Sequence, residues 1–140
     1  LEHECAVGIT HLDGLVLARS AFHHSMNYRS VVIYGRFEAE DDPAAKAAAF
    51  RAFVEHVSPG RAAQVRPPSP AELAGTRLLR IALDEAVAKI RNWGAEDADE
   101  DMAIPVWAGV LPLALGAGPL QPEAGCADRQ PPAAPAFIGG

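Results

Sequence analysis

Cysteine is scarce in this chain of 140 residues, which contains only Cys5 and Cys126. They lie far apart and no C-x-x-C pair occurs, so the sequence predicts neither a disulfide framework nor a cysteine metal site. We therefore expect a reducing, cytoplasmic location. No apolar run reaches the roughly 18 residues of a membrane helix, and LEHECAVGIT at the N-terminus lacks the basic and apolar regions of a signal peptide. No membrane partner is expected.

Positive charge is also in short supply, because 12 Lys and Arg stand against 18 Asp and Glu. This balance argues against nucleic acid as a partner, since a phosphate backbone attracts a basic face. The glycine-rich G-x-x-x-x-G-K-[ST] and G-x-G-x-x-G motifs are missing, which excludes nucleotide binding by those routes. The charge is uneven, however. Residues 14–37 contain three arginines and no acid, whereas residues 96–101 contain five acids and are expected to form a solvated loop.

Apolar and β-branched runs predict several strands. The first two would form a hairpin around an Asp13-Gly14 turn, and a polar loop over residues 18–30 would lead into the strongest strand. Residues 76–93 are ambiguous, because leucines favour a strand at their start while propensity favours a helix from Ala86 onward. The expected strands are residues 5–11, 14–20, 30–40 and 104–113.

One main helix is predicted at about residues 42–57, with Asp42 as its N-cap and Pro43 in its first position. Its apolar residues recur at helical spacing and predict one buried face. These residues are Phe50, Phe53, Val54 and Val57.

The remaining segments set the domain organisation. A short helix is expected at 70–75, and the Pro/Gly/Ala-rich stretch 114–140 is predicted to be a disordered tail. Residues 1–113 would then form one domain. Several strands around one main helix predict a mainly β (α+β) or barrel-like fold.

The stretch ARSAFHHSMNYRS, residues 18–30, carries the chemistry most suited to a ligand. Arginine forks, serine hydroxyls and an amide in an acid-free segment are typical of an oxyanion or phosphate site. The alternative is a polar surface loop with solvated arginines.

The adjacent histidines, His23 and His24, could bind a metal or haem, or transfer protons near neutral pH. Neighbouring residues on a strand point to opposite faces, so both would not easily serve one metal. The alternative is a loop pair that packs or forms hydrogen bonds. A nucleophilic Ser20 beside either histidine would lack a G-x-S-x-G elbow and an orienting aspartate.

Three later residues have two interpretations each. Trp107 could fill the core or stack against a flat ring. Lys89 and Arg91 could reach an anionic ligand or remain solvated.

Several segments in order over residues 5–113 resemble the pyridoxamine 5'-phosphate oxidase-like family of flavin-binding split-barrel proteins, in particular its flavin-nucleotide-binding branch. The resemblance implies a six-stranded split barrel, a homodimer and FMN at the dimer interface. It also implies further N-terminal strands, which in family members precede the position of Leu1. The segments are GLVLARSAFHHSMNYRSVV, VEHVSPGR, RPPSPAEL, AKIR and PVWAGVLPL.

The same resemblance implies the residues at or near the flavin. Ser20, His23, His24, Ser25, Asn27, Tyr28, Arg29 and Ser30 match the loop and the start of its strand, and Lys89, Arg91 and Trp107 match later segments. The implied function is an FMN-dependent oxidoreductase of unknown substrate. The alternatives are a haem-binding module of the same fold, with His23 or His24 as axial ligand, and a truncated fragment without catalysis.

Overall fold

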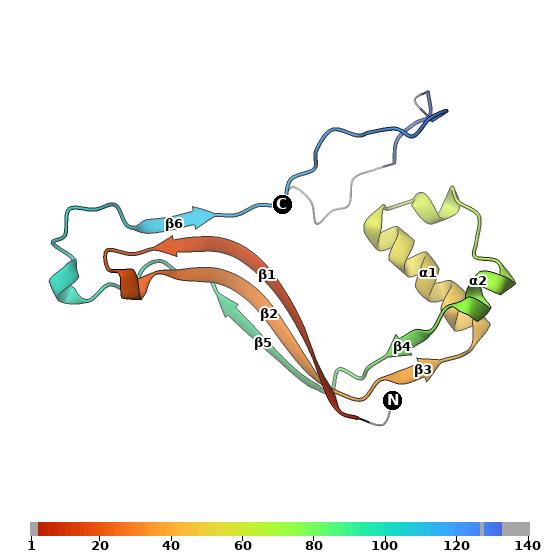
Figure 1. The fold of residues 1–140 in the computed structure, drawn as a ribbon, viewed down its shortest axis with the longest axis horizontal. Coiled ribbons are helices and arrows are strands. Elements are labelled where there is room, and N and C mark those ends of the chain that lie inside the picture. Colours follow the sequence, from red (N-terminus) through yellow and green to blue (C-terminus); the bar gives the residue numbers. More distant parts are fainter. Residues whose placement is uncertain (1–2, 127, 133–140) are drawn as a thin grey trace. The chain divides into compact units, whose positions relative to one another are not determined.

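The strands of this chain form two separate sheets, each in its own unit (Figure 1). The computed structural model describes residues 3–126 and 128–132. The first unit, here called the sheet unit, combines Leu1–Phe37 with Ile81–Ala114. The second, here called the helical unit, combines Glu38–Arg80 with Leu115–Gly140. Among the described residues, no helix is both long and apolar enough to span a membrane.

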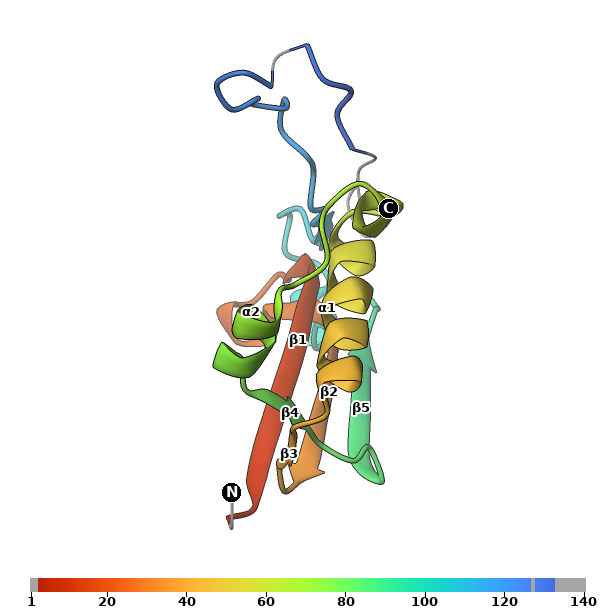
Figure 2. The same ribbon diagram turned by 90° about the vertical axis from the view of Figure 1, so that its right-hand side faces the viewer.

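The sheet unit contains an antiparallel sheet with the strand order β5-β2-β1-β6. Figures 1 and 2 show β2 between β1 and β5. The short helix η1 (Ala21–His23) connects β1 to β2, and η3 (Asp99–Asp101) precedes β6. The strand bounds are Cys5–Leu17 for β1, Ser25–Gly35 for β2, Glu85–Arg91 for β5 and Gly109–Pro112 for β6.

The predicted hairpin around Asp13-Gly14 is wrong. β1 runs through both residues as one strand, and the pairing with β2 shifts by one residue between Leu12 and Gly14, which makes Asp13 a bulge. Gly14 lets β6 pack closely there, since a Cβ on it would lie 3.2 Å from the carbonyl oxygen of Leu111. A bulge with glycine beside it has the same sequence signature as a turn.

Two other strand predictions need correction. The strongest strand begins at Ser25, not residue 30, and ends at Gly35, while β3 (Glu38–Glu40) pairs in the other sheet. The helix favoured from Ala86 onward is wrong, because β5 pairs with β2 along its whole length and this pairing overrides helix propensity. The last strand is shorter than predicted, only Gly109–Pro112.

The main helix is confirmed as α1 (Pro43–Val57), and the oxygen of Asp42 accepts from the backbone N–H of Ala45 at 2.9 Å. Its predicted buried face is wrong, since Phe53 is 66% exposed. The helical residue that is buried is Lys46, whose Nζ donates to the carbonyl of Leu73 at 3.4 Å.

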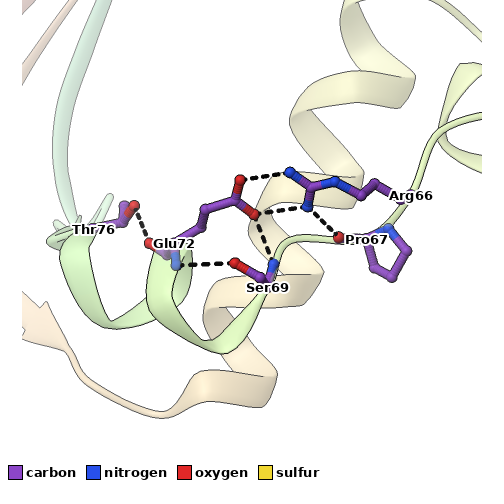
Figure 3. A network of polar contacts seen from close by, with 5 residues as sticks. All are labelled: Arg66, Pro67, Ser69, Glu72 and Thr76. Atoms are coloured by element: carbon purple, nitrogen blue, oxygen red, sulfur yellow. Dashed lines mark hydrogen bonds and ion pairs between the residues drawn. The ribbon is translucent and has the colours of Figure 1, made fainter.

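The second predicted helix is confirmed as α2 (Pro70–Gly75), and a polar network holds its start (Figure 3). Ser69 and Glu72 form a reciprocal capping box, and Arg66 donates to both carboxylate oxygens of Glu72 at 2.7 and 2.8 Å. The Arg66 hydrogen bonds, followed by those from Ser69, lower the pKa of Glu72 to about 2. The helical unit also contains η2 (Arg61–Ala63) and the strand pair β3 and β4 (Leu78–Arg80).

The mainly β fold with one main helix is confirmed. β5 and β6 each leave one edge unpaired among the described residues, so these strands do not close into a barrel. The apolar side chains that are buried lie on β1 and β2 and just after β1: Val16, Ala18 and Ile33. The domain boundary at residue 113 stays a prediction. Residues 113–126 and 128–132 contain no helix or strand, and residues 127 and 133–140 of the predicted tail lie outside the described residues.

Candidate functional site

Ser20 organises the loop between β1 and β2. Its Oγ lies 3.0 Å from Nδ1 of His23, and its carbonyl oxygen lies 2.9 Å from Nδ1 of His24. The carbonyl also accepts from the backbone N–H of His23 at 3.3 Å. The structure therefore brings three of the predicted site residues into one hydrogen-bonded loop.

Asp97 is part of this loop's support, although the segment 96–101 was expected to be solvated. Its carboxylate accepts from the backbone N–H of Arg19 at 2.8 Å and from the Arg19 guanidinium at 2.9 Å. Burial acts to raise the pKa of Asp97, but hydrogen bonds from Arg19 and from the backbone of Ser20 outweigh it, so the pKa lies below its usual value of 3.8. For Asp97 the interpretation as a solvated residue is wrong.

The register of the sheet divides the predicted residues of β2 between two faces, because successive side chains on a strand alternate. Directly paired residues share a face, so Ser30 has Thr10 of β1 on one side and Lys89 of β5 on the other. We call these three residues the hydroxyl–lysine row. The neighbouring row on the same face contains Leu12 and Tyr28. Ser25, Asn27 and Arg29 alternate with these residues along β2.

The hydroxyl–lysine row has a donor set suited to phosphate, with one ammonium group and two hydroxyl groups. Nζ of Lys89 lies 5.9 Å from the centre of the Tyr28 ring, and Oγ of Ser30 lies 3.5 Å from the carbonyl oxygen of Lys89. In the described part of the chain, no carboxylate lies within ion-pair distance of Lys89. A phosphorylated ligand would therefore meet a cation without an intramolecular competitor.

Arg91 is already engaged by the protein. Its guanidinium donates to Oδ1 of Asn27 at 2.6 Å and to the carbonyls of Trp93 and Gly94 at 3.0 and 3.1 Å. It also stacks on the Trp93 ring, 4.7 Å from the ring centre. Asn27 is 8% exposed. These two predicted site residues thus hold the end of β5 against β2.

Arg29 is engaged in the same way at the bulge of β1. Its Nε and Nη2 donate to the two carboxylate oxygens of Asp13 at 2.9 and 2.8 Å. Nδ1 of His11 lies 3.1 Å from the same carboxylate. These hydrogen bonds, in which Arg29 donates and Asp13 accepts, lower the pKa of Asp13 and raise the pKa of Arg29. Arg29 was expected to bind an anionic ligand, but its guanidinium is already paired with a carboxylate of the same chain.

Trp107 and Ser25 lie near the same end of the sheet as the loop. Ser25 is exposed and pairs with Val16, which pairs in turn with Val110 of β6. The ring of Trp107 covers Gly109, where a Cβ would lie 2.8 Å from the ring, yet Trp107 is 68% exposed. It does not fill the core, so its large apolar surface is available to a ligand or a partner.

Three residues that sequence reasoning missed belong to these clusters: Thr10, Asp13 and Asp97. Thr10 could have been found from its alternation within the first strand, once its register with Ser30 was known. Asp13 was hidden by its resemblance to a turn residue. Asp97 carries no signal that distinguishes it from its four acidic neighbours.

A groove of about 1040 Å³ lies elsewhere, in the helical unit. Its lining is mostly apolar and includes Phe50, Val54, Val65 and Pro68, together with the Arg66–Glu72 pair. None of the predicted site residues lines it.

The open antiparallel sheet with one main helix is a fold of the split-barrel class. A family model described as "Pyridoxamine 5'-phosphate oxidase" matches residues 2–90, so the chain belongs to this family. The resemblance predicted from sequence is confirmed. No match was found among curated proteins.

Two solved structures extend the comparison. The flavocytochrome Anf3 from Azotobacter vinelandii is 35% identical with a TM-score of 0.85, over 93% of this chain and 61% of that one. An FAD- and haem-binding protein from Mycobacterium smegmatis is 38% identical with a TM-score of 0.82, over 91% of this chain and 63% of that one. This chain therefore spans less than two thirds of the length of either protein.

Proposed function

We propose that the chain binds a flavin nucleotide, FMN, and holds its phosphate on the hydroxyl–lysine row of Thr10, Ser30 and Lys89. The observation that carries this proposal is the register of three strands, which puts the Lys89 ammonium group in one row with two hydroxyls, and no carboxylate of the described residues pairs with it. Membership of the pyridoxamine 5'-phosphate oxidase family supports it. The two similar structures are named as a flavocytochrome and an FAD-binding protein, and FAD shares the phosphate ester.

A bound flavin supplies electron transfer, which makes an oxidoreductase the natural role. The chain's own residues would bind the flavin nucleotide and orient it. Lys89 and the two hydroxyls would hold the phosphate, while Tyr28 offers an aromatic surface beside them. Arg91 and Asn27 fix the neighbouring strand end. The substrate is left open.

Titration of FMN with the full chain, followed by quenching of flavin fluorescence, tests the proposal. The Lys89→Gln replacement should lower the affinity for FMN by about tenfold or more and change the affinity for riboflavin by no more than about twofold, because only FMN loses a charge-assisted bond. Arg77→Gln is the matched control, since it removes one exposed cation from the helical unit. The same series with FAD shows which nucleotide is preferred.

Each outcome has a defined meaning. If the unaltered chain quenches neither flavin nucleotide, the function fails for this chain and the interpretation as a fragment without catalysis is favoured. If Lys89→Gln weakens FMN and riboflavin equally, the phosphate does not lie on this row. Arg29→Ala should change the affinity for FMN and for riboflavin only slightly. A selective loss of FMN affinity in this variant would show that the phosphate binds at Arg29.

Haem binding is the second candidate, and the His24 contact favours it. A carbonyl oxygen only accepts, so the bond from His24 to the Ser20 carbonyl requires a proton on Nδ1, and in a neutral imidazole this leaves Nε2 with a free lone pair. An imidazole whose other nitrogen donates to a carbonyl is the usual form of a metal-ligating histidine. The partner of His23 is a hydroxyl, which fixes neither tautomer.

A visible spectrum separates the two candidates. Flavin absorbs near ~450 nm and haem gives a Soret band near ~400 nm. His24→Ala should abolish a Soret band that His23→Ala retains, and equal spectra for the two variants would remove His24 as the ligand.

We also propose the homodimer that the family resemblance implies. Ile9 and Ile90, which the register puts on one face of the sheet, are each about 60% exposed, an unusual amount of apolar surface for strand residues. Light scattering on the full chain should give twice the mass of one chain, and a monomer would contradict this assembly. The cytoplasmic location stays a prediction.

A further inference from the structure

Asp97 lies in an acidic segment but behaves unlike an acidic surface residue. Its side chain is 1% exposed, whereas Glu96 beside it and Glu100 beyond it are exposed. Its carboxylate reaches across 78 positions of the chain to the backbone N–H and the guanidinium of Arg19. A buried carboxylate with several donors is fixed in place, because any other position would leave it without hydrogen bonds.

The contacts of Asp97 continue into the loop of the two histidines. The carboxylate holds the backbone at Arg19, and its pKa also responds to the backbone N–H of Ser20. Ser20 in turn contacts His23 through its hydroxyl and His24 through its carbonyl. Asp97 is therefore connected to both imidazoles through its hydrogen bond to the Arg19 backbone, the adjoining backbone of Ser20 and the contacts of Ser20.

We propose that Asp97 is a positioning residue for this loop: it fixes the Ser20 carbonyl, which keeps the proton of His24 on Nδ1 and presents the unprotonated Nε2 to a ligand. This fixing of the loop by Asp97, here called the clamp, is inferred from the geometry of the chain alone. Only the use of Nε2, as the donor to a haem iron, rests on the proposed second function.

Long-range proton–nitrogen NMR on the ¹⁵N-labelled full chain without ligand tests the clamp. At about pH 8, where imidazole is neutral, His24 should show the Nδ1–H tautomer. Asp97→Asn keeps the shape of the side chain but loses its charge and one acceptor, so His24 should shift toward the tautomer mixture of a free imidazole. Amide exchange at His23 should accelerate by roughly tenfold. Glu96→Gln is the matched control and should change neither signal.

The outcomes separate the clamp from the function. An unprotonated Nδ1 on His24 in the unaltered chain, or unchanged signals in Asp97→Asn, would overturn the positioning role. If Asp97→Asn loses its dispersed spectrum, Asp97→Glu gives the same comparison, because it keeps the charge and moves the carboxylate by one methylene.

A titration with hemin then addresses the ligand. Asp97→Asn should lower the affinity for hemin by about tenfold, because a residue that positions a metal ligand is lost. Glu96→Gln should leave this affinity unchanged. If the unaltered chain binds no hemin, the haem function fails, but the tautomer measurement still decides on Asp97.

Discussion

Among the described residues, the sheet unit contains two arginine–aspartate pairs of similar length that differ in how far they are buried. Arg19 and Asp97 approach to 2.9 Å, with side chains 25% and 1% exposed. Arg29 and Asp13 approach to 2.8 Å, with side chains 60% and 30% exposed. The first pair joins distant segments and includes a backbone N–H, whereas the second joins neighbouring strands through side chains alone.

The comparison shows that distance does not measure what an ion pair contributes. An exposed pair gains little, because water and salt screen it and two long side chains lose freedom. Removing one partner of a buried pair leaves an uncompensated charge in the interior. Arg19 and Asp97 are therefore expected to determine structure, and Arg29 and Asp13 to adjust local charge.

The largest effect should come from removing Arg19, with the removal of Arg29 as the comparison. Arg19→Leu leaves the buried Asp97 carboxylate without its cation, so the midpoint of thermal unfolding should fall by roughly 5 °C. Arg29→Leu should change it by no more than about 1 °C. Circular dichroism on both variants and the unaltered chain measures the difference.

One feature of Arg19 itself reduces the expected loss. Nε of Arg19 is buried without a partner, and its removal offsets part of the loss. Equal shifts in the two variants would show that burial of the carboxylate does not distinguish the pairs.

Much of the fold could be predicted from local signals. Asp42, Pro43 and the alanines define α1 from its own sequence, and Ser69 with Glu72 defines the start of α2. The Asp13 bulge and β5 could not be predicted, because each depends on a strand far away in the chain. Residues 85–91 have helix propensity, and only their pairing with β2 decides the outcome.

The candidate site shows the same limit. The residue types of the loop and of Lys89 pointed to a ligand, and the family resemblance grouped them. Alternation along β2 could have separated Arg29 from Ser30, but the pairing of Thr10 with Ser30 requires the sheet register. The partners of Arg19, Arg29 and Arg91 required three-dimensional contacts, so the sequence overstated how many cations are available to a ligand.

A medium effect is expected from Asp13→Asn, which releases Arg29 from its carboxylate. Since Arg29 alternates with Ser30 on β2, the freed cation would act on a phosphate at the hydroxyl–lysine row only through long-range attraction. FMN affinity should rise by no more than about twofold at low salt, and the gain should vanish near ~0.5 M salt. Fluorescence titration at both salt concentrations measures this.

The control is Glu4→Gln, which removes an exposed acid that lies 3.7 Å from Arg36. A rise of about tenfold in Asp13→Asn alone, persisting in salt, would mean that Arg29 contacts the phosphate directly.

The smallest effect is expected in the dependence of stability on acidic pH. The pKa of Asp13 lies below its usual 3.8, mainly because Arg29 donates hydrogen bonds to it. A group with a lowered pKa in the folded state contributes stability above its unfolded value, and this contribution is lost as the pH falls through the folded pKa. The difference in melting temperature between the unaltered chain and Asp13→Asn should therefore be at most about 1 °C at neutral pH and should decline as the pH falls below 3.8 through the lower pKa of the folded state.

The pKa of Asp97 is lowered as well, so its contribution to stability is also lost as the pH falls. This contribution should be larger, because a buried carboxylate that becomes protonated also releases the loop backbone. Thermal unfolding of the unaltered chain, Asp13→Asn and Asp97→Asn across this pH range compares the two directly. If Asp13→Asn removes more of the acid sensitivity than Asp97→Asn does, the exposed pair contributes more to stability than the buried one, and the contrast between the two pairs is wrong.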